Sequence, residues 1–385
     1  MVLIIGGGIG GMALALGLHR LNIPFRVFER VPKLEEVGAG LSVFWNGVRV
    51  LEALGVAGKI RASSQRLLGG EFTNHRGRLL GGMDFGAIKG LEKSENYIAH
   101  RADLHRWLRE ELPAEALITN AECTGFRADE TRVVALFRDG TEAEGTVLVG
   151  SDGLHSAVRR QLVGPEPLRY SGQTCYRGVA DIKANQPDIV REIQGPGQRA
   201  GYCPLSADRV YWWAALNSPP NVVESPEQRA KQLTESFAGW QHGLPEAIAA
   251  TPPAGILKND LVDRLPLKRW SQGRVTLLGD AAHPMLPNLG QGANSAMEDS
   301  LALARLLSGN LPIPEALLAY EAERLARTTR FTKDSWTFGL PVRWKNPILV
   351  SIRESLLLLT GKSMMRGLLV RGIGFDPGTL GEEEV

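Results

Sequence analysis

A cluster of glycines lies close to the start of the chain, where the backbone could approach phosphate groups. Gly6, Gly8 and Gly11 follow a G-x-G-x-x-G spacing. In such a motif the first glycine permits a tight turn, the second admits a pyrophosphate, and the third lets a helix pack closely. Glu29, which comes 18 residues after Gly11, could accept hydrogen bonds from a ribose diol. Together these residues predict a site for a dinucleotide with a free ribose 2′-hydroxyl, such as FAD or NAD.

The elements around these glycines are the ones that such a site needs. Residues 2–5 predict a buried strand, residues 12–21 an apolar helix, and residues 24–28 a second strand. These pieces form one βαβ unit of about 30 residues, and the N–H groups at the helix start would face the phosphates. The predicted phosphate-binding residues are Gly6, Gly8, Ile9, Gly10 and Gly11.

Further along the chain the sequence alternates between two patterns. Buried strands are expected at 146–150 and 274–278, and helices near 45–54, 101–112, 293–308 and over most of 312–375. Residues 171–254 contain alternating segments that are typical of an antiparallel sheet with one buried face.

We therefore predict an α/β fold with a discontinuous, Rossmann-like domain around a parallel sheet, an inserted antiparallel-sheet domain, and C-terminal helices. The expected bounds are 1–72, 97–170 and 255–330 for the nucleotide domain, 73–96 and 171–254 for the substrate domain, and 331–385 for the C-terminal helical segment.

Two more motifs follow predicted strands. Residues 278–284 read L-G-D-A-A-H-P and lead into a glycine-rich segment, and residues 152–159 read D-G-L-H-S-A-V-R. A carboxylate just past a strand end, such as Asp280, can hold the hydroxyls of a polyol. We expect His283 to be a packed, hydrogen-bonded residue rather than a catalyst.

In order and context, the three motifs make the chain resemble the class A flavoprotein monooxygenases, the para-hydroxybenzoate hydroxylase family. The family pattern G-D-A-x-H-x-x-x-P-x-x-G-x-G matches residues 279–292, and D-G-x-x-S-x-x-R matches residues 152–159. The resemblance extends over residues 1–330 and implies FAD as the bound cofactor.

The resemblance also implies individual roles at the flavin. Asp280 would contact the ribityl chain, and the segment that ends at Gly292 would bring backbone N–H groups towards the flavin N1 and C2 carbonyl edge. A helix start there would favour the anion of reduced flavin by ~0.3–2 kcal/mol. The residues expected in this segment are Pro287, Gly290, Gly292, Ala293 and Asn294.

Other cofactor contacts come from the same resemblance. Asp152 would lie near the pyrophosphate with Arg159 as its structural partner, and Arg101 would meet the cofactor from its helix. Arg30, beside Glu29, would contact the adenosine half.

The reaction that these features imply needs a second nucleotide only transiently. One dinucleotide fingerprint is present and no C-x-x-C pair accompanies it, whereas a two-dinucleotide reductase would be expected to have both. The resemblance implies reduction of FAD by NADPH or NADH, and hydroxylation or epoxidation of a small aromatic or polyene substrate by molecular oxygen through a flavin C4a-hydroperoxide. An FAD-dependent reductase or halogenase-like oxidoreductase without oxygen insertion, and a non-catalytic FAD-binding protein, stay open as alternatives.

The substrate side is expected on the antiparallel sheet. Alternation along a strand at 209–216 would put Arg209, Tyr211 and Trp213 on one face. Because the family has an arginine and an aromatic residue on the flavin side of this strand, we predict these three as catalytic-site residues. Arg177, Trp45 and Asn46 are further pocket candidates.

The choice between hydroxylation and epoxidation stays open. Residues 171–181 are similar to the corresponding stretch of zeaxanthin-epoxidase-type members, and Asn288 stands where some hydroxylases have an acid. No residue stands out as a base for a phenol.

The composition excludes several other classes of protein. A formal net charge of +2 over 385 residues offers no basic field for nucleic acid. Cys123, Cys175 and Cys203 are widely spaced and unpaired in sequence, so we expect no disulfide framework and no metal site. Free thiols, and a first strand that leaves no room for a leader, favour a cytoplasmic protein. A monomer and a homodimer both stay open.

The C-terminal residues leave two interpretations open. The apolar stretch 347–359 contains Arg353 and Glu354 and cannot be a transmembrane helix of ~20 apolar residues. Cationic residues, including Lys362 and Arg366, interrupt the apolar runs near the end of the chain. We expect helices that pack across the two domains, with contact to a membrane surface as the alternative.

Overall fold

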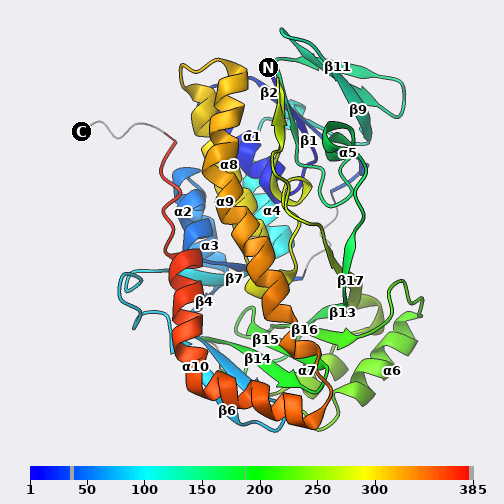
Figure 1. The fold of residues 1–385 in the computed structure, drawn as a ribbon, viewed down its shortest axis with the longest axis vertical. Coiled ribbons are helices and arrows are strands. Elements are labelled where there is room, and N and C mark those ends of the chain that lie inside the picture. The colour runs from blue at the N-terminus through cyan, green and yellow to red at the C-terminus, as the bar shows by residue number, and fades with distance from the viewer. Residues whose placement is uncertain (35–38, 187, 381–385) are drawn as a thin grey trace.

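The computed structural model describes residues 1–34, 39–186 and 188–380. A parallel sheet lies toward one end of the molecule and a larger, mostly antiparallel sheet toward the other (Figure 1). Long helices run along both. This arrangement confirms the expected α/β class with a Rossmann-like part, an inserted antiparallel sheet and C-terminal helices.

The parallel sheet is formed by short apolar strands. Its order is β18 (Ser271–Gln272), β19 (Val275–Leu277), β12 (Val147–Gly150), β1 (Val2–Ile5), β2 (Phe25–Phe28) and β8 (Leu117–Ile118), with only β18 antiparallel to its neighbour among these described strands. Every residue of β1, β12 and β19 is buried. Such continuous apolar strands are typical of a sheet that is covered on both faces.

The carboxyl ends of these strands are aligned. Ile5 lies beside Phe28 and Gly150, and Gly150 lies beside Leu277. The order of the strands changes direction at β1, because β2 lies on one side of β1 and β12 on the other. Open α/β sheets bind ligands at such a switch point. The three sequence motifs therefore begin at one edge of one sheet.

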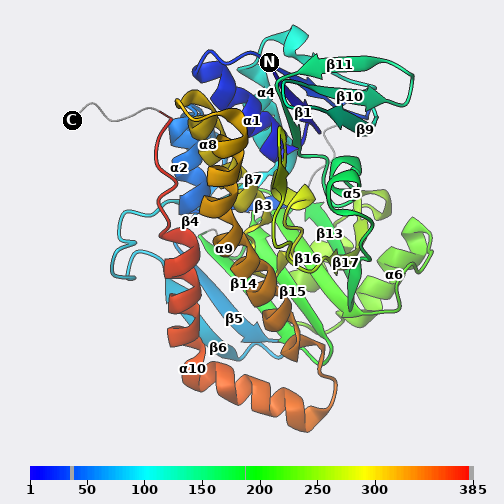
Figure 2. The ribbon, with the colours of Figure 1, turned by 45° about the horizontal axis from the view of Figure 1, so that its top comes forward.

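Helices and a small meander cover the two faces. α8 (Gly292–Ser308) packs on α1 (Ile9–Arg20), and α9 (Ile313–Gly339) packs on α8. Figures 1 and 2 show these helices on one side of β1 and the meander on the other side. The meander side comprises β9 (Cys123–Ala128), β10 (Val133–Phe137), β11 (Glu142–Gly145) and α5 (Ala157–Val163).

The antiparallel sheet extends beyond the bounds that the sequence predicted for it. Its order is β17 (Leu257–Asp263), β13 (Arg169–Ala180), β16 (Val210–Asn217), β15 (Gln198–Pro204), β14 (Ile189–Gly195), β5 (Gly69–Asn74) and β6 (Leu79–Asp84). β5 begins before residue 73 and β17 lies after residue 254, so the sheet includes residues that the sequence assigned to the nucleotide domain. The division into domains itself stays a prediction.

One face of this sheet is covered by α6 (Pro226–Ser236) and α7 (Leu244–Ala249). Trp212 points to this face, where its Nε1 donates to Thr251 Oγ1 at 2.8 Å. The segments that connect the two sheets are β3 (Gly40–Val43), α2 (Trp45–Ala53), α3 (Ala57–Ser63), β4 (Gln65–Leu67), β7 (Asn96–His100) and α4 (Arg101–Glu110).

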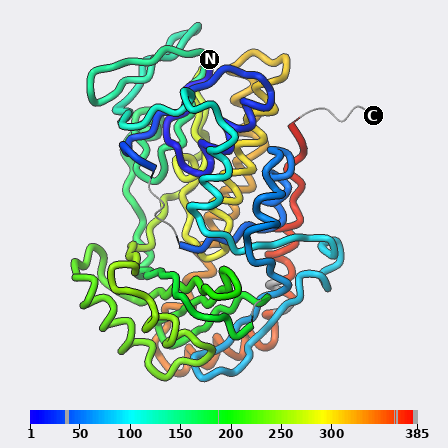
Figure 3. Tube along the Cα trace, turned by 180° about the vertical axis from the view of Figure 1, so that it is seen from behind, coloured from blue at the N-terminus to red at the C-terminus, as the bar shows by residue number. Residues whose placement is uncertain are grey.

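The last helices join the two regions. α9 runs from the parallel sheet to the antiparallel sheet, and α10 (Pro347–Ile373) packs on β6 and bends along its length (Figures 1 and 2). Figure 3 shows the final segment returning along the molecule towards the parallel sheet. Within the described residues, no helix combines the length and apolarity that crossing a membrane requires. The side chain of Lys362 and residues 381–385 lie outside the described part.

Candidate active site

A cavity of about 1110 Å³ connects the strand-end edge of the parallel sheet with the antiparallel sheet and α10. The residues predicted from sequence that line it are Gly8, Ile9, Gly10, Arg101, Tyr211, Trp213, Asp280, Pro287, Gly290, Gly292 and Ala293. The structure thus brings the first and third motifs and the predicted substrate strand to one space.

The glycine loop leaves room for a ligand at Gly8, whereas Gly6 and Gly11 are closely packed against the backbone. A Cβ on Gly6, whose φ is +104°, would lie 2.4 Å from Ser151 O, and a Cβ on Gly11 would lie 2.1 Å from Gly6 O. A Cβ on Gly8 would meet nothing within 4 Å. Open space beside Gly8, at the N-terminus of α1, fits a pyrophosphate that accepts hydrogen bonds from free N–H groups.

Glu29 is fixed next to this loop. Its carboxylate accepts hydrogen bonds from Gly7 N at 2.7 Å and from Val31 N at 3.1 Å. It follows β2 directly, as predicted, although it lies outside the cavity wall. Arg30 beside it is exposed and also lies outside the wall.

Asp280 and Arg101 both face the cavity. Burial raises the pKa of the Asp280 carboxyl, and His283 and Arg101 oppose that rise. Burial lowers the pKa of Arg101, and Asp280 opposes that fall. A Cβ on Gly292 would lie 4.0 Å from Asp280 Oδ1, so this carboxylate stands beside the start of α8 and offers oxygens to hydroxyl groups of a ligand.

The start of α8 combines an open backbone with an anchored side chain. Gly292 and Ala293 line the cavity, and the first N–H groups of a helix have no acceptor within it. Asn294 is fully buried outside the wall, where it donates to Ser42 O at 3.0 Å and accepts from Phe44 N at 3.1 Å. Its side chain therefore ties β3 to α8.

The second motif supports the third. Asp152 Oδ2 accepts from Ala157 N at 2.8 Å, while its buried Oδ1 has no hydrogen-bond partner among the described residues. Burial raises the pKa of Asp152. Asp152 itself lies outside the cavity wall, although Ser151 and Gly153 line it.

The expectation that Arg159 pairs with Asp152 is wrong. Arg159 donates to Ala281 O and Ala282 O, both at 2.9 Å, and pairs with Glu166 at 2.6 Å. Its side chain leaves the first turn of α5 towards the loop that follows β19, where unpaired carbonyls need donors.

A buried ionic cluster, formed by His283, Glu298, Asp299 and Arg324, lies behind that loop. Asp299 accepts from His283 Nε2 at 2.5 Å, from Arg324 Nε at 2.8 Å and from Gly279 N at 3.1 Å. Burial opposes ionisation of Asp299, but His283 and Arg324 outweigh it and lower the pKa to about 2. The prediction that His283 is a packed, hydrogen-bonded residue is confirmed.

Tyr211 and Trp213 line the cavity, but the placement predicted for Arg209 is wrong. β16 begins at Val210, and the backbone oxygen of Arg209 accepts from Leu205 N at 2.9 Å to close the turn that follows β15. The side chain of Arg209 is exposed there and does not follow the alternation of the strand.

Of the further pocket candidates Arg177, Trp45 and Asn46, only the first lies in the cavity wall. Arg177 lines the cavity. Asn46 is fully buried and donates to Glu298 Oε1 at 2.6 Å, and Trp45 lies outside the wall, so both expectations were wrong. Both residues begin α2, whose first turn packs against α8 instead of facing the cavity.

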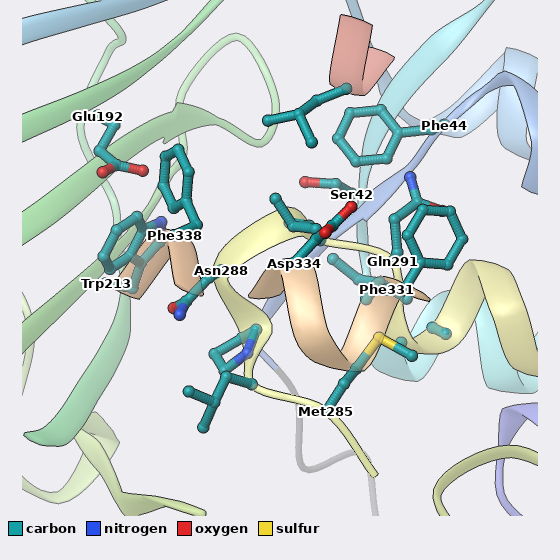
Figure 4. A pocket seen from close by; sticks show the side chains of 18 of the residues that line it. Ser42, Phe44, Glu192, Trp213, Met285, Asn288, Gln291, Phe331, Asp334 and Phe338 are labelled. Carbon is teal, nitrogen blue, oxygen red and sulfur yellow. The ribbon is translucent and has the colours of Figure 1, made fainter. Parts of the chain in front are cut away.

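Three cavity residues form a polar group, which we call the Arg199 group: Arg199, Asn288 and Glu192. The sequence singles out only Asn288 among them. Arg199, only 2% exposed, lies 5.1 Å from the ring centroid of Trp213. Its Nη2 donates to Asn288 Oδ1, and its Nη1 lies 3.7 Å from Glu192 Oε1. Figure 4 shows Trp213, Asn288 and Glu192 on the same side of the pocket.

Arg199 keeps unused donors. Its Nε and Nη1 have no hydrogen-bond partner among the described residues, although both are buried. Because an unpaired buried donor is costly, these N–H groups are suited to an acceptor atom on a ligand. Asn288 is in turn fixed by donating to Ser335 O at 2.7 Å.

A sequence signal for Arg199 comes from Gly201 in the same strand, β15, and from Trp213 in the neighbouring strand, β16. Gly201 pairs with Trp213 across β15 and β16, and a Cβ on Gly201 would lie 1.9 Å from Trp213 Nε1. A glycine opposite a tryptophan leaves room for the indole to lie across the strand. Arg199 and Cys203 share that face with Gly201, because alternate residues of a strand point the same way.

Apolar side chains gather on the part of the cavity wall that β5, β6, β14, α9 and α10 form, beside charged lining residues such as Glu71 and Asp334. This part, which we call the apolar lobe, is lined by Phe72, Leu80, Met83, Phe85, Val190, Phe338, Leu357, Leu368 and Leu369. The rings of Phe72 and Phe338 meet edge to face with centroids 6.3 Å apart. Cβ atoms on Gly81 and Gly361, which also line the cavity, would meet nothing within 4 Å. The lobe therefore has unfilled space.

Comparison with known proteins gives consistent matches over most of the chain. A family model described as an FAD binding domain matches residues 1–335. Aurachin C monooxygenase/isomerase of Stigmatella aurantiaca is 38% identical over 98% of both chains. A 2-heptyl-3-hydroxy-4(1H)-quinolone synthase of Pseudomonas aeruginosa is 31% identical over 97% of this chain and 98% of its own. The structure of Klebsiella pneumoniae HpxO complexed with FAD and uric acid is 28% identical, with a TM-score of 0.90 over 98% of both chains.

Proposed function

Because the chain belongs to the FAD-binding family of class A monooxygenases, we propose that this member oxygenates a heteroaromatic ring with a long apolar chain. The membership confirms the expectation of FAD and of a monooxygenase that uses NAD(P)H. The alternatives without oxygen insertion lose their support. The ring, its substituent and the choice of NADH or NADPH belong to the proposal.

The observation that carries the proposal is the two-part form of the cavity beyond the cofactor motifs. The Arg199 group and Trp213 offer a polar, aromatic site, and the apolar lobe continues from it beneath α10. A pocket that is mostly apolar with a few convergent polar groups is typical of small-molecule sites. The name of the Pseudomonas relative describes a ring of this kind with a heptyl chain, which supports the same pairing here.

The cofactor would occupy the motif end of the cavity. The start of α1 beside Gly8 would hold the pyrophosphate, Glu29 the adenosine ribose, and Asp280 the ribityl hydroxyls. The N–H groups of Gly292 and Ala293 would face the flavin carbonyl edge. When bound and reduced by NAD(P)H, FAD supplies the activation of molecular oxygen.

The other cofactor-site residues that the sequence predicts would support or contact the cofactor from further away. Asp152 and Asn294 shape the wall from behind, since one caps α5 and the other anchors β3. Arg101 would contact the cofactor beside Asp280. Arg30 stays a candidate for the adenosine half from its exposed position.

Arg199 would activate the ring. Its free N–H groups would donate to an oxygen substituent and favour the anionic form of that oxygen. An anionic oxygen raises the electron density of the neighbouring ring carbon, which is the atom that an electrophilic oxygen attacks. Tyr211 and Trp213 would pack on the ring, which also keeps water away.

Glu192 is the carboxylate that we propose as the proton acceptor. Its side chain is 14% exposed, lines the cavity and lies beside Arg199. Glu192 fits this role because its Oε1 lies 3.7 Å from Arg199 Nη1, whereas the amide of Asn288, at the position where some hydroxylases have an acid, is not a base. A Glu192→Gln variant, in which the side chain can no longer accept a proton, should lower kcat without changing FAD content.

The decisive experiment is a substrate series in which only the chain length changes. Purified FAD-loaded enzyme is given 4-quinolones with methyl to nonyl groups at carbon 2, NADH or NADPH, and labelled oxygen. We expect label in the product and a KM that falls as the chain lengthens, until the lobe is filled. NAD(P)H oxidation that is independent of every ring tested, without label in any product, would contradict the proposal.

The compartment is a smaller part of the same proposal. Within the described residues the three cysteines are free and buried, which fits a reducing cytoplasm.

A further inference from the structure

The first turns of α10 present apolar side chains on the side that faces away from the protein. Ile348, Ile352, Leu356 and Leu359 recur at intervals of four, four and three residues, a spacing that puts them on one helix face. All four are exposed, Ile348 to 70% and Leu359 to 82%, and Leu349 lies among them. We call these five residues the outer face of α10.

The opposite side of the same helix belongs to the cavity. Leu357 and Gly361 line the apolar lobe, and Arg353 is buried with its Nη2 donating to Gly195 O at 3.2 Å. Figures 1 and 2 show α10 at the outside of the molecule, beyond the antiparallel sheet. Packing of α10 is thus satisfied by its inner side, and a contiguous exposed apolar face indicates a contact with something else.

The charges around the outer face are almost all positive. Residues 341–375 include six Lys and Arg and one Glu, of which Arg353 is buried on the inner side and Arg343 is half-buried. Lys345, Arg366 and Arg371 are exposed. The acid, Glu354, is partly buried and accepts a hydrogen bond from Asn74 Nδ2 at 3.1 Å. An apolar stripe flanked by cations is complementary to a layer of acyl chains under anionic headgroups.

We propose that the outer face of α10 docks on the surface of a bilayer that contains anionic lipids. The leucines and isoleucines enter the boundary between headgroups and acyl chains, while Lys345 and Arg366 contact lipid phosphates. A second copy of the chain suits this face less well. A two-fold contact would bring the same cations close to their own copies, with no exposed carboxylate on α10 to pair with them.

Docking has a consequence for substrate entry that rests on the proposed function. A ring with a long apolar chain partitions into bilayers. Because α10 contributes both the outer face and part of the lobe wall, docking places the lobe next to the lipid phase. The chain of the substrate then passes from one apolar environment to another without full exposure to water.

The test measures binding of the FAD-loaded enzyme to vesicles, with no substrate present. Vesicles of phosphatidylcholine alone are compared with vesicles that also contain phosphatidylglycerol, by co-sedimentation at low and high salt. We expect binding to the mixed vesicles, weakened by salt. The double variant Ile352→Glu with Leu359→Glu should lower the partition coefficient about tenfold or more.

A matched control puts the same charge on a distant exposed apolar residue. Val223→Glu, at a side chain that is 96% exposed in the loop before α6, should bind vesicles as the unchanged protein does. The double variant should keep its FAD, its unfolding temperature and its turnover of a short-chain substrate in vesicle-free buffer, because its residues face away from the cavity.

Two results would overturn the proposal. One is equal binding of the double variant and the unchanged protein to mixed vesicles. The other is no vesicle binding, together with a dimer in sedimentation velocity that the double variant abolishes, which would identify a second copy as the occupant. Failure of every alkylated ring as a substrate would contradict the proposed function and leave vesicle binding as an independent result.

Discussion

The two ends of the cavity differ in whether backbone atoms or side chains form their walls. At the motif end, backbone atoms at strand ends and helix starts form the wall, and a single added carbon on Gly6 or Gly11 would collide with a carbonyl oxygen. At the lobe end, side chains from strand centres and helices form the wall, and an added carbon on Gly81 or Gly361 would meet nothing. Substitutions at the first end therefore disturb the backbone itself, whereas substitutions at the second end change the volume that is left for a ligand.

The largest effect is expected behind the motif end, at the buried ionic cluster. Asp299→Asn removes a charge that His283 and Arg324 both contact. Breaking a buried pair typically costs about 3–5 kcal/mol of unfolding free energy, so the unfolding midpoint in denaturant should fall steeply. Glu323→Gln, in an exposed pair with Arg305, should change it by less than about 1 kcal/mol. A similar effect of both substitutions would contradict the assigned role of the cluster.

The same residue predicts a pH dependence. Asp299 has a folded-state pKa lowered to about 2, below the ordinary value of about 3.9. Its contribution to stability is complete above pH ~4 and is lost as the pH falls towards ~2. The unfolding free energy of the unchanged protein should therefore fall more steeply over this range than that of Asp299→Asn.

The second effect separates packing from cofactor binding within the glycine loop. Gly11→Ala should destabilise the protein by ~3 kcal/mol, because its Cβ would lie 2.1 Å from Gly6 O and α1 would have to move. Gly8→Ala should unfold as the unchanged protein does when both lack FAD, yet bind FAD more weakly. Thermal unfolding and FAD titration test the pair. Full FAD affinity in Gly8→Ala would place the pyrophosphate elsewhere.

The third effect concerns the border between the two ends. Arg199→Gln should lower kcat/KM by about ten- to a hundredfold, since a hydrogen bond to a charged group contributes about 1.5–3 kcal/mol. FAD content should not change. Arg209→Gln is the matched control, because that arginine is exposed in a turn, and it should leave the steady-state rates as they are. Equal losses in both variants would remove Arg199 from the proposed mechanism.

The smallest effect is a change of preference. Gly81→Leu should fill part of the apolar lobe and reduce kcat/KM about tenfold for the longest chain, with little change for a methyl group. Gly58→Leu, at an exposed position of α3 that is also free of contacts, is the control. The measurement is the chain-length profile in each variant, and parallel profiles would show that the chain does not lie in the lobe.

How much of the molecule the sequence predicts follows from the same contrast. Gly6, Glu29 and Asp280 could be identified because each lies within three residues after the carboxyl end of a strand, and aligned strand ends bring such residues together. Backbone-built sites need glycines at fixed spacings, and these spacings are visible in a single sequence.

The lobe end leaves weaker signals. Arg199 and Glu192 come from strands whose pairing depends on the whole sheet, and their segments have no spacing rule. The prediction for Arg209 failed because a strand that starts one residue later turns that residue into part of a hairpin. Leu357 and Leu369 could not be placed from the sequence, because the helix pattern does not say which cavity a face covers.

α9 gives the cavity a fixed length. The residues of this helix that line the cavity run from Ala326 to Phe338, which is in the apolar lobe, and these two residues are about 18 Å apart along the axis at ~1.5 Å per residue. The helix therefore fixes the separation between the part of the wall next to the buried ionic cluster and Phe338 in the apolar lobe. One inserted residue would turn Phe338 by ~100° around the axis, so evolution can resize the lobe by replacing side chains but not by lengthening its frame.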